Sequence, residues 1–308
     1  IPTSKYSRDK VTVVEETDSG QELGFYGPLD SGEASGENVR YVRSPTLTTY
    51  YIAFNAKQTP KPVRQAAAYA LNREDVVESV FKNRYQPGYN LTPPGIYPGG
   101  ASAYNSDVEE NYPYGYNTTN IEDAKSVMED AGYGPDNRVS VTATTIAGDS
   151  GYQRVFTRLQ SKLRAAYIDM DIQQAEFGTI ISKAISGDME VFALGDGMEY
   201  PGPQNFLRFL HGSDPAHQFT RWGAEGGYFN EDYRQTALNA WEENYAAEDA
   251  TQESKNEAFQ TVEEMNWASV QELPTIHPTS PRFWHKDVDV EMYGVMENQT
   301  FTDLTLNR

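Results

Sequence analysis

The chain has 308 residues, 38% of them hydrophobic, and carries a formal net charge of −20 because 45 acidic residues outnumber 25 basic ones. This length and composition predict a folded core of one or two domains and exclude a disordered chain. The chain has no cysteine, which excludes disulfides, thiolate catalysis and cysteine zinc sites, and its few basic residues argue against binding duplex nucleic acid.

The acidic residues are scattered along the chain and do not form one tail. Such an evenly acidic surface predicts a protein adapted to high salt, because salt screens the self-repulsion of like charges. The histidines are His211, His217, His277 and His285. They form no H-x-x-x-H pair, so a histidine-rich metal site is not expected. No apolar run approaches the roughly 20 residues needed to cross a bilayer.

The first third of the chain mixes loops, a strand and helices. Residues 1–45 are polar and Gly-rich, which predicts loops with one or two short strands. The aromatic and β-branched run 48–55 predicts a strand. Residues 60–81 predict helix, with Pro62 in the first turn and a break with a new N-cap at 72–75. Residues 84–118, rich in Pro, Gly, Tyr and Asn without periodicity, predict a long surface loop.

Three N-x-T triplets begin at Asn90, Asn117 and Asn298. In a secreted protein such triplets can accept glycans, and they also arise by chance. The sequence leaves their modification open.

The middle of the chain alternates strands and helices. A short helix over 121–131, ended by Gly132, precedes the alternation. The pattern then predicts strand, helix, strand, helix and strand at 138–146, 152–166, 167–175, 177–188 and 189–196. This order predicts a right-handed α/β unit with a mostly parallel sheet. The chain is then predicted to be helical to about residue 272, followed by a Pro-broken extended segment over 273–295.

The segment Met-Glu-Tyr-Pro-Gly-Pro at 198–203 follows the last predicted strand directly. In open α/β sheets, ligands bind beside the carboxyl ends of the strands. Glu199 and Tyr200 therefore stand where a ligand is expected, although a solvated loop acid is the simpler interpretation of Glu199. Trp222 follows on a Gly-rich loop, where an exposed indole can stack on a ligand and a packed one is structural.

Five segments, in order, resemble the extracytoplasmic solute-binding proteins of the peptide and nickel type, family 5, which serve ABC importers; they span 50–81, 121–134, 158–197, 198–207 and 272–290. The resemblance implies an α/β fold, a periplasmic-binding-protein-like (type II) lobe with a β-α-β core, plus segments that belong to the other lobe. Together with the acidic composition, it suggests a haloarchaeal source.

The resemblance also implies a division of the chain into three parts. Residues 1–46 would be the tail of lobe I and the approach to the hinge, residues 47–272 lobe II, which binds the substrate, and residues 273–308 the return segment to lobe I. Most of the first lobe's sequence is missing by comparison with the family. We therefore expect the chain to be the second half of such a protein.

In peptide-binding members of the family, an Asp at the position of Glu199 pairs with the ligand's N-terminal ammonium. The resemblance thus implies a ligand site that includes Glu199, Tyr200, Asp196 and Trp222, with Glu in place of the usual Asp. A base for the ligand's carboxylate is expected after the first core strand. Only Arg154 stands there, inside the predicted helix, and Arg208 and Arg221 are weaker candidates.

The implied function is that of the substrate-binding component of an ABC importer. It would bind a peptide-like solute, with an oligopeptide favoured, and deliver it to a permease formed by separate chains. We expect a monomer on the extracellular face of the cytoplasmic membrane, lipid-anchored, without cofactor or metal and without affinity for nucleic acid.

Other functions remain open from the residues alone. A member of the same family could bind an oligosaccharide or nickel, although His211 and His217, six residues apart, do not share a helix face. A secreted carbohydrate-active enzyme could use Asp196 and Glu199 as acid and base. The chain has no nucleophile elbow and no phosphate-binding glycine motif, so we expect no enzyme. A surface protein without a small ligand is the third alternative.

Overall fold

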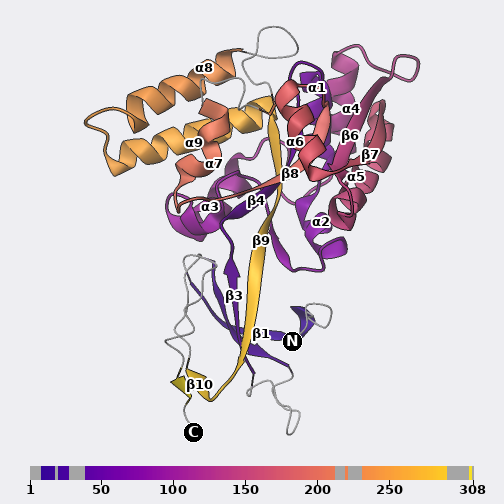
Figure 1. The fold of residues 1–308 in the computed structure, drawn as a ribbon. Coiled ribbons are helices and arrows are strands. Elements are labelled where there is room, and N and C mark those ends of the chain that lie inside the picture. The colour runs from indigo at the N-terminus through magenta and orange to yellow at the C-terminus, as the bar shows by residue number, and fades with distance from the viewer. Residues whose placement is uncertain are drawn as a thin grey trace.

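The computed structural model of the chain describes residues 8–17, 20–27, 39–211, 219–220, 231–289 and 305–306. An upper α/β part stands on a lower β-ribbon, and strand β9 (Glu272–His285) runs through both (Figure 1). The ribbon consists of β1 (Val11–Glu16), β2 (Glu22–Tyr26), β3 (Val39–Pro45) and the second half of β9. A separate pair, β10 (Val288–Asp289) and β11 (Thr305–Leu306), lies beyond it.

The main sheet has the strand order β1-β2-β3-β9-β4-β8-β6-β7, and β5 (Tyr85–Pro87) pairs with β9 off this path. The remaining strands are β4 (Thr48–Phe54), β6 (Val139–Ile146), β7 (Ile168–Ala175) and β8 (Val191–Gly197). Strand β6 is parallel to both β7 and β8, whereas β4 is antiparallel to β8 and β9. The predicted parallel unit is confirmed, and an antiparallel strand joins it to β9.

Helices α5 (Ser150–Leu163) and α6 (Phe177–Ser186) make the two crossovers of this unit. Because β6 lies between β7 and β8, the chain crosses in opposite directions, and right-handed crossovers then place the two helices on opposite faces. The cores agree: α5 side chains lie in one buried cluster and α6 side chains in the other. Five apolar side chains of α5 are buried: Tyr152, Val155, Phe156, Leu159 and Leu163.

The two faces of β4 separate two hydrophobic cores. Ile52 and Phe54 point into the core shared with α1 (Lys61–Ala70), α2 (Arg73–Ser79), α4 (Ile121–Asp130) and α5. Tyr51 and Ala53 point into the core shared with α6, α7 (Pro203–His211), α8 (Glu231–Ala240) and α9 (Gln252–Ser269). Figure 1 shows α7, α8 and α9 grouped on one side of the upper sheet. A π-helical turn, Trp241–Tyr245, extends α8.

Local signals in the sequence predicted several element ends correctly. Asn72 caps α2 by accepting from the N–H of Asp75, so the predicted break between α1 and α2 is confirmed. Pro62 lies in the first turn of α1. Gly132 follows α4 at φ +85°, where a residue without Cβ is favoured.

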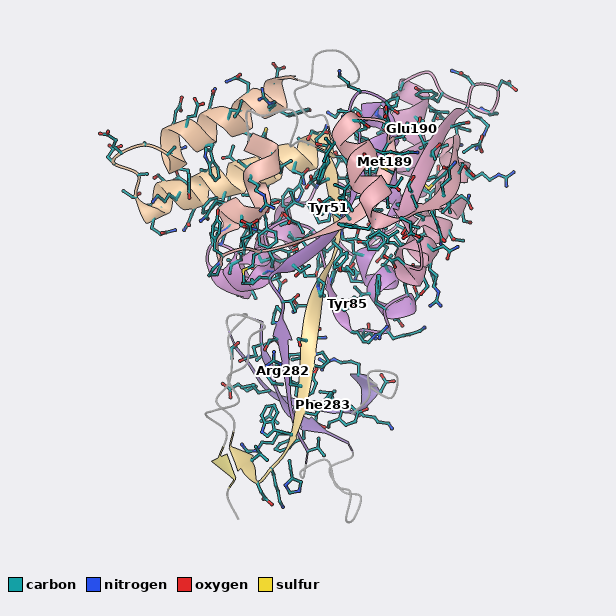
Figure 2. All side chains as sticks on the ribbon, viewed as in Figure 1. Tyr51, Tyr85, Met189, Glu190, Arg282 and Phe283 are labelled. Atoms are coloured by element: carbon teal, nitrogen blue, oxygen red, sulfur yellow. The ribbon has the colours of Figure 1, made fainter. Side chains whose placement is uncertain are left out.

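The prediction of at most two short strands over residues 1–45 is wrong, because this segment forms β1, β2 and β3. Strand β3 pairs with a distant part of the chain, Val39 opposite His285 and Pro45 opposite Thr279. Phe283 of β9 lies in the lower part of Figure 2, where its ring contacts Tyr26 and Tyr41 at centroid distances of 4.9 and 5.5 Å. Strand β3 is therefore stabilised by a distant partner strand that its local sequence does not reveal.

The prediction of a long loop over 84–118 is also wrong in its centre. The segment contains β5, a 3-10 turn at Pro94–Ile96 and the twelve-residue helix α3 (Gly100–Asn111). Helix α3 follows Gly99 at φ +85° without a side-chain cap, and its buried side chains are only Ala101, Tyr104 and Val108. Both usual signals of a helix, a cap and a strong apolar stripe, are therefore weak in its sequence.

The segment 273–285 is extended, as predicted, but its prolines do not break it. Pro274, Pro278 and Pro281 all lie within the single strand β9. The register with β4 shifts between Tyr50 and Tyr51, next to Pro274, so the missing N–H falls at an irregularity of the ladder.

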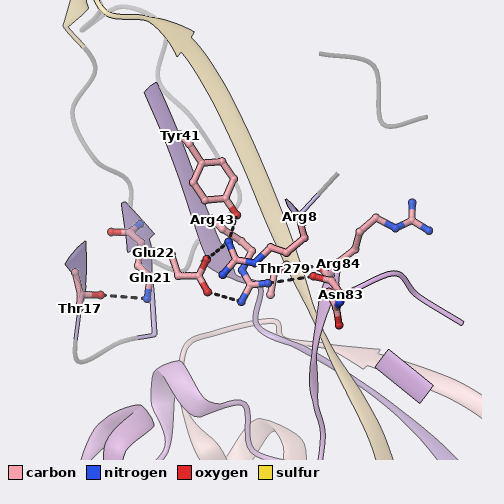
Figure 3. A network of polar contacts seen from close by, with 9 residues as sticks. All are labelled: Arg8, Thr17, Gln21, Glu22, Tyr41, Arg43, Asn83, Arg84 and Thr279. Carbon is pink, nitrogen blue, oxygen red and sulfur yellow. Dashed lines mark hydrogen bonds and ion pairs between the residues drawn. The ribbon is translucent and has the colours of Figure 1, made fainter. Parts of the chain in front are cut away.

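A mostly buried ion-pair network lies in the ribbon where it meets the upper part (Figure 3). The carboxylate of Glu22 lies 2.7 Å from the guanidinium groups of both Arg8 and Arg43. Arg43 also donates to the carbonyl of Asn83, in the turn after α2, at 3.3 Å. One side chain of the ribbon thus holds the upper part directly.

Candidate ligand-binding edge of the parallel sheet

The candidate site lies where β8 ends, at the edge of the upper sheet nearest the ribbon. Asp196 and Gly197 pair with Thr49 and Thr48 at the start of β4. The N–H of Met198 then donates to the carbonyl of Leu47 at 3.0 Å. The strand end is therefore bonded to the connection between β3 and β4, which links the two parts of the molecule.

The loop after β8 is held by the first turn of α7. The N–H of Glu199 donates to the side-chain oxygen of Asn205 at 3.3 Å, and Asn205 is buried. The N–H of Gly202 donates to the carbonyl of Tyr200 at 3.0 Å. The side chain of Glu199 is exposed, and Tyr200 is 45% exposed. The structure thus leaves a solvated carboxylate and a tyrosine ring together beside the strand end.

Gly195 allows an aromatic pair to approach this edge. A Cβ on Gly195 would lie 2.7 Å from ring carbons of Tyr50, closer than real Cβ contacts. The ring of Tyr50 stacks on Tyr152 of α5, with centroids 6.1 Å apart. The edge therefore combines acidic groups from β8 with aromatic rings from β4 and α5.

Asp196 is mostly buried and pairs with Arg208 of α7, Oδ1 to guanidinium nitrogen at 3.2 Å. Burial raises the pKa of the Asp196 carboxyl, the Arg208 guanidinium lowers it, and the Glu199 charge raises it again. Arg208 also donates to the carbonyl of Asn205. The arginine acts as an internal counter-ion that ties α7 to β8. Among the described residues, no basic side chain forms an ion pair with Glu199.

Two further acids lie behind the site, and the sequence analysis did not find them. Burial raises the pKa of Glu263 of α9 to about 7, although its carboxylate accepts the N–H groups of Leu91 and Thr92 at 2.9 and 2.7 Å. Burial also raises the pKa of Glu272 at the start of β9 to about 8, helped by the charges of Asp196 and Glu263 and opposed by Arg208. The sequence is rich in acidic residues, and no local pattern distinguishes these two buried glutamates from the exposed ones.

His277 of β9 is a neutral structural residue. The Thr49 hydroxyl donates to the carbonyl of Leu91 at 2.6 Å, so its oxygen accepts from the histidine Nδ1–H at 3.0 Å. The Tyr104 hydroxyl donates to Nε2 at 3.0 Å, which completes the ring's bonding. Burial lowers the pKa of His277 to about 3. Within the described residues, no three His, Asp or Glu side chains gather so that they could hold a metal ion.

The remaining predicted site residues are an exposed arginine of α5 and residues that lie outside the described part of the chain. Arg154 is exposed on the second turn of α5. Trp222 and Arg221 lie outside the described residues, as do His217 and the side chain of His211.

The three glycan-acceptor triplets differ in their exposure. Asn90 is 0% exposed, so its side chain is not available for a glycan in the folded chain. Asn117 is exposed, and Asn298 lies outside the described residues.

Comparison with known proteins assigns the chain to a protein family. Residues 17–218 match the sequence profile described as "Bacterial extracellular solute-binding proteins, family 5 Middle". The chain belongs to this family. Family 5 membership confirms the resemblance on which the predicted fold was based, and it covers β2 to α7, including the candidate edge.

Curated relatives and solved structures agree with the family assignment. The chain is 26% identical over 271 residues to a di/tripeptide-binding protein 2 of Pseudomonas aeruginosa, covering 85% of the chain and 46% of that protein. It is 22% identical over 213 residues to a dipeptide-binding protein of Escherichia coli, covering 66% of the chain and 37% of that protein. The chain therefore spans less than half the length of these relatives.

Among solved structures, HbpA2 from Haemophilus parasuis superposes with a TM-score of 0.70 at 17% identity, covering 88% of this chain and 50% of that one. OppA from Haemophilus influenzae, solved with the peptide RPPGFSPFR, superposes with a TM-score of 0.66 at 21% identity, covering 87% of this chain and 50% of that one. These superpositions confirm the predicted periplasmic-binding-protein-like α/β fold. None of the described helices of this family 5 chain is long and apolar enough to cross a membrane.

Proposed function

We propose that the chain supplies the ligand-facing lobe of the substrate-binding component of an ABC importer, and that the solute is peptide-like. The observation that carries this proposal is the exposed carboxylate of Glu199 at the carboxyl end of β8, in a family 5 fold. The names of the two relatives above, which bind dipeptides and tripeptides, support the peptide class.

The electrostatics of the edge favour an ammonium group. Arg208 compensates Asp196 at 3.2 Å, so of these two acids Glu199 is the one that is left to bind a ligand. A charge-assisted hydrogen bond between a carboxylate and an ammonium contributes about 1.5–3 kcal/mol net. Tyr200, 45% exposed, supplies apolar surface beside that contact, and the exposed Arg154 is the candidate for a ligand carboxylate.

Two connections between the ribbon and the upper part could serve as a hinge about which one closes on the other. The chain passes between ribbon and upper part at the β3–β4 link, Thr46 and Leu47, and again within β9. Hinge closure about a few such residues would bury the ligand. The closed form would then be recognised by a membrane permease made of separate chains.

The remaining features of the proposal follow from the family and the composition. The protein would act as a monomer outside the cytoplasmic membrane, held there by a lipid anchor, and without catalysis. The net charge of −20 supports adaptation to high salt, because the unscreened self-repulsion of such a surface opposes folding.

The proposal is tested by calorimetry on the full natural protein in molar salt, with a tetrapeptide whose amino terminus is either free or acetylated. Glu199→Gln should lower affinity for the free peptide by about 10- to 100-fold, and acetylation should do the same to the wild type. The mutation should not weaken the acetylated peptide further. Glu253→Gln, an exposed acid on α9, is the matched control. If Glu199→Gln binds the free peptide as tightly as the wild type does, Glu199 is not part of the site.

A further inference from the structure

A cavity of about 190 Å³ lies on the other side of β9 from the candidate edge. Ile276 of β9 pairs with Tyr50 of β4 and with Pro87 of β5, so β4 and β5 flank β9 on opposite edges. The cavity is lined from the β5 side, by β5 itself, α3 and the end of β1, and by no residue of β8 or α7. It is therefore separate from the edge that carries Glu199.

The walls of this cavity are aromatic. Tyr89, Tyr104 and Tyr116 line it, and two prolines and small apolar side chains fill the gaps between them. The Tyr89 hydroxyl donates to the carboxylate of Glu74 at 2.7 Å, and the Tyr104 hydroxyl is bonded to His277. Because these hydroxyls are engaged elsewhere, the two rings offer the cavity mainly their π systems. Tyr89 and Tyr104 are both buried, so this wall is already formed without a ligand.

Apart from the tyrosines, the polar side chains that line the cavity are two neutral amides, Gln86 and Asn105, and one carboxylate, Glu16. Glu16, at the end of β1, lines it, and none of the described residues that line it is basic. The side-chain oxygen of Gln86 is buried without a hydrogen-bond partner in the described part of the chain. Burial raises the pKa of Tyr116, and the nearby carboxylates of Glu74 and Glu109 raise it further. At the opposite wall the charge of Arg73 opposes the raised pKa of Tyr89 and Tyr104, so the negative charge lies on the side of Glu16 and Tyr116.

The same aromatic cluster already binds one cation of the protein. The guanidinium of Arg73 lies over the rings of Tyr89 and Tyr112, at 4.3 and 4.7 Å from their centroids, and no carboxylate pairs with it among the described residues. Attraction between a cation and aromatic rings is thus part of how this region folds. Tyr104 and Tyr116 are the rings left for a second cation.

We propose that this cavity is a second binding site, which takes a small organic cation of the alkylammonium or quaternary ammonium class. The rings of Tyr104 and Tyr116 would contact the cationic head, and Glu16 would supply the opposite charge. A cavity of 150 Å³ holds a benzene molecule, so about 190 Å³ accommodates roughly six to eight heavy atoms. With one lining carboxylate and no lining histidine, the cavity is a poor site for a metal ion.

The test compares choline with 3,3-dimethylbutan-1-ol, which has the same shape without the charge, in NMR titrations of the 308-residue chain. Choline should bind at least about tenfold more tightly than the neutral alcohol. Glu16→Gln and Tyr116→Leu should each weaken choline by about fivefold or more. Glu15→Gln changes the same charge on the same strand without lining the cavity, and it should leave choline binding unchanged.

The proposal is overturned if choline does not bind at about 50 mM or if the neutral alcohol binds equally well. It is also overturned if Glu15→Gln weakens choline binding as much as Glu16→Gln does. Circular dichroism of each variant checks that the fold is retained. Displacement of choline by a saturating peptide would also contradict a separate site, whereas failure of peptide binding would leave this proposal untouched.

Discussion

Glu272→Gln tests whether a buried acid sets the pH dependence of folding. Glu272 is 3% exposed and is surrounded by the negative potential of Asp196 and Glu263, so its pKa lies at about 8 and not at the ordinary 4.5. The folded chain therefore holds a proton that the unfolded chain releases above about pH 4.5. This proton makes the free energy of unfolding fall as pH rises from about 4.5 to 8.

The size of the effect follows from the shift. A change from 4.5 to about 8 corresponds to about 5 kcal/mol at most, because one pKa unit is worth about 1.4 kcal/mol. Water penetration and residual structure in the unfolded chain reduce this, so we expect about 2–3 kcal/mol. Glutamine resembles the protonated acid and has no charge to lose. Glu272→Gln should therefore match the wild type within about 1 kcal/mol at pH 5 and exceed its stability by about 2–3 kcal/mol at pH 9.

The assay is denaturant unfolding followed by tryptophan fluorescence at pH 5, 7 and 9, at one salt concentration. Glu253→Gln, on the exposed face of α9, controls for the loss of one negative charge and should show no pH-dependent difference from the wild type. Part of the dependence should persist in Glu272→Gln, because the pKa of Glu263 is also raised, to about 7. Parallel stability curves for Glu272→Gln and wild type between pH 5 and 9 would refute the reasoning.

Two further substitutions test the junction and the edge by denaturant unfolding. Glu22→Gln should destabilise the fold by about 3 kcal/mol, since it leaves two arginines without their carboxylate at a mostly buried site, whereas Asp169→Asn, at an exposed ion pair, should barely move the unfolding midpoint. Gly195→Ala should cost about 1–3 kcal/mol because the new Cβ meets Tyr50 at 2.7 Å. Gly178→Ala on α6, where nothing lies within 4 Å, should stabilise by about 0.5–1 kcal/mol. Equal destabilisation by Glu22→Gln and Asp169→Asn would contradict the argument about the buried ion pairs. Equal effects of Gly195→Ala and Gly178→Ala on stability would contradict the argument about the Tyr50 contact.

The parallel core was predictable because its signals are local. The apolar stripe of α5 repeats every three or four residues, and Asn72 stands one residue before the helix that it caps. Glu199 could be placed at a strand end for the same reason, since the order of strands and helices alone determines which segment follows β8. The structure adds that its carboxylate is solvated while that of Asp196 is paired.

The cavity and the buried acids were not predictable in this way. Glu16, Gln86 and Tyr116 are distant in the sequence and meet only because β1 and β5 are brought to α3 by β9. Glu263 and Glu272 have the same side chain as many exposed residues in this chain. Only the packing around them raises their pKa.

The sequence by itself determined the α/β class, the β-α-β-α-β order and the position of the candidate edge, because helix and strand periodicity and capping act over a few neighbouring residues. Tertiary structure alone decided that β9 runs unbroken through three prolines, that β1, β2 and β3 form a ribbon with it and that Arg208 pairs with Asp196. Those features depend on contacts between distant segments, where burial and pairing set the energies, and no local pattern encodes them.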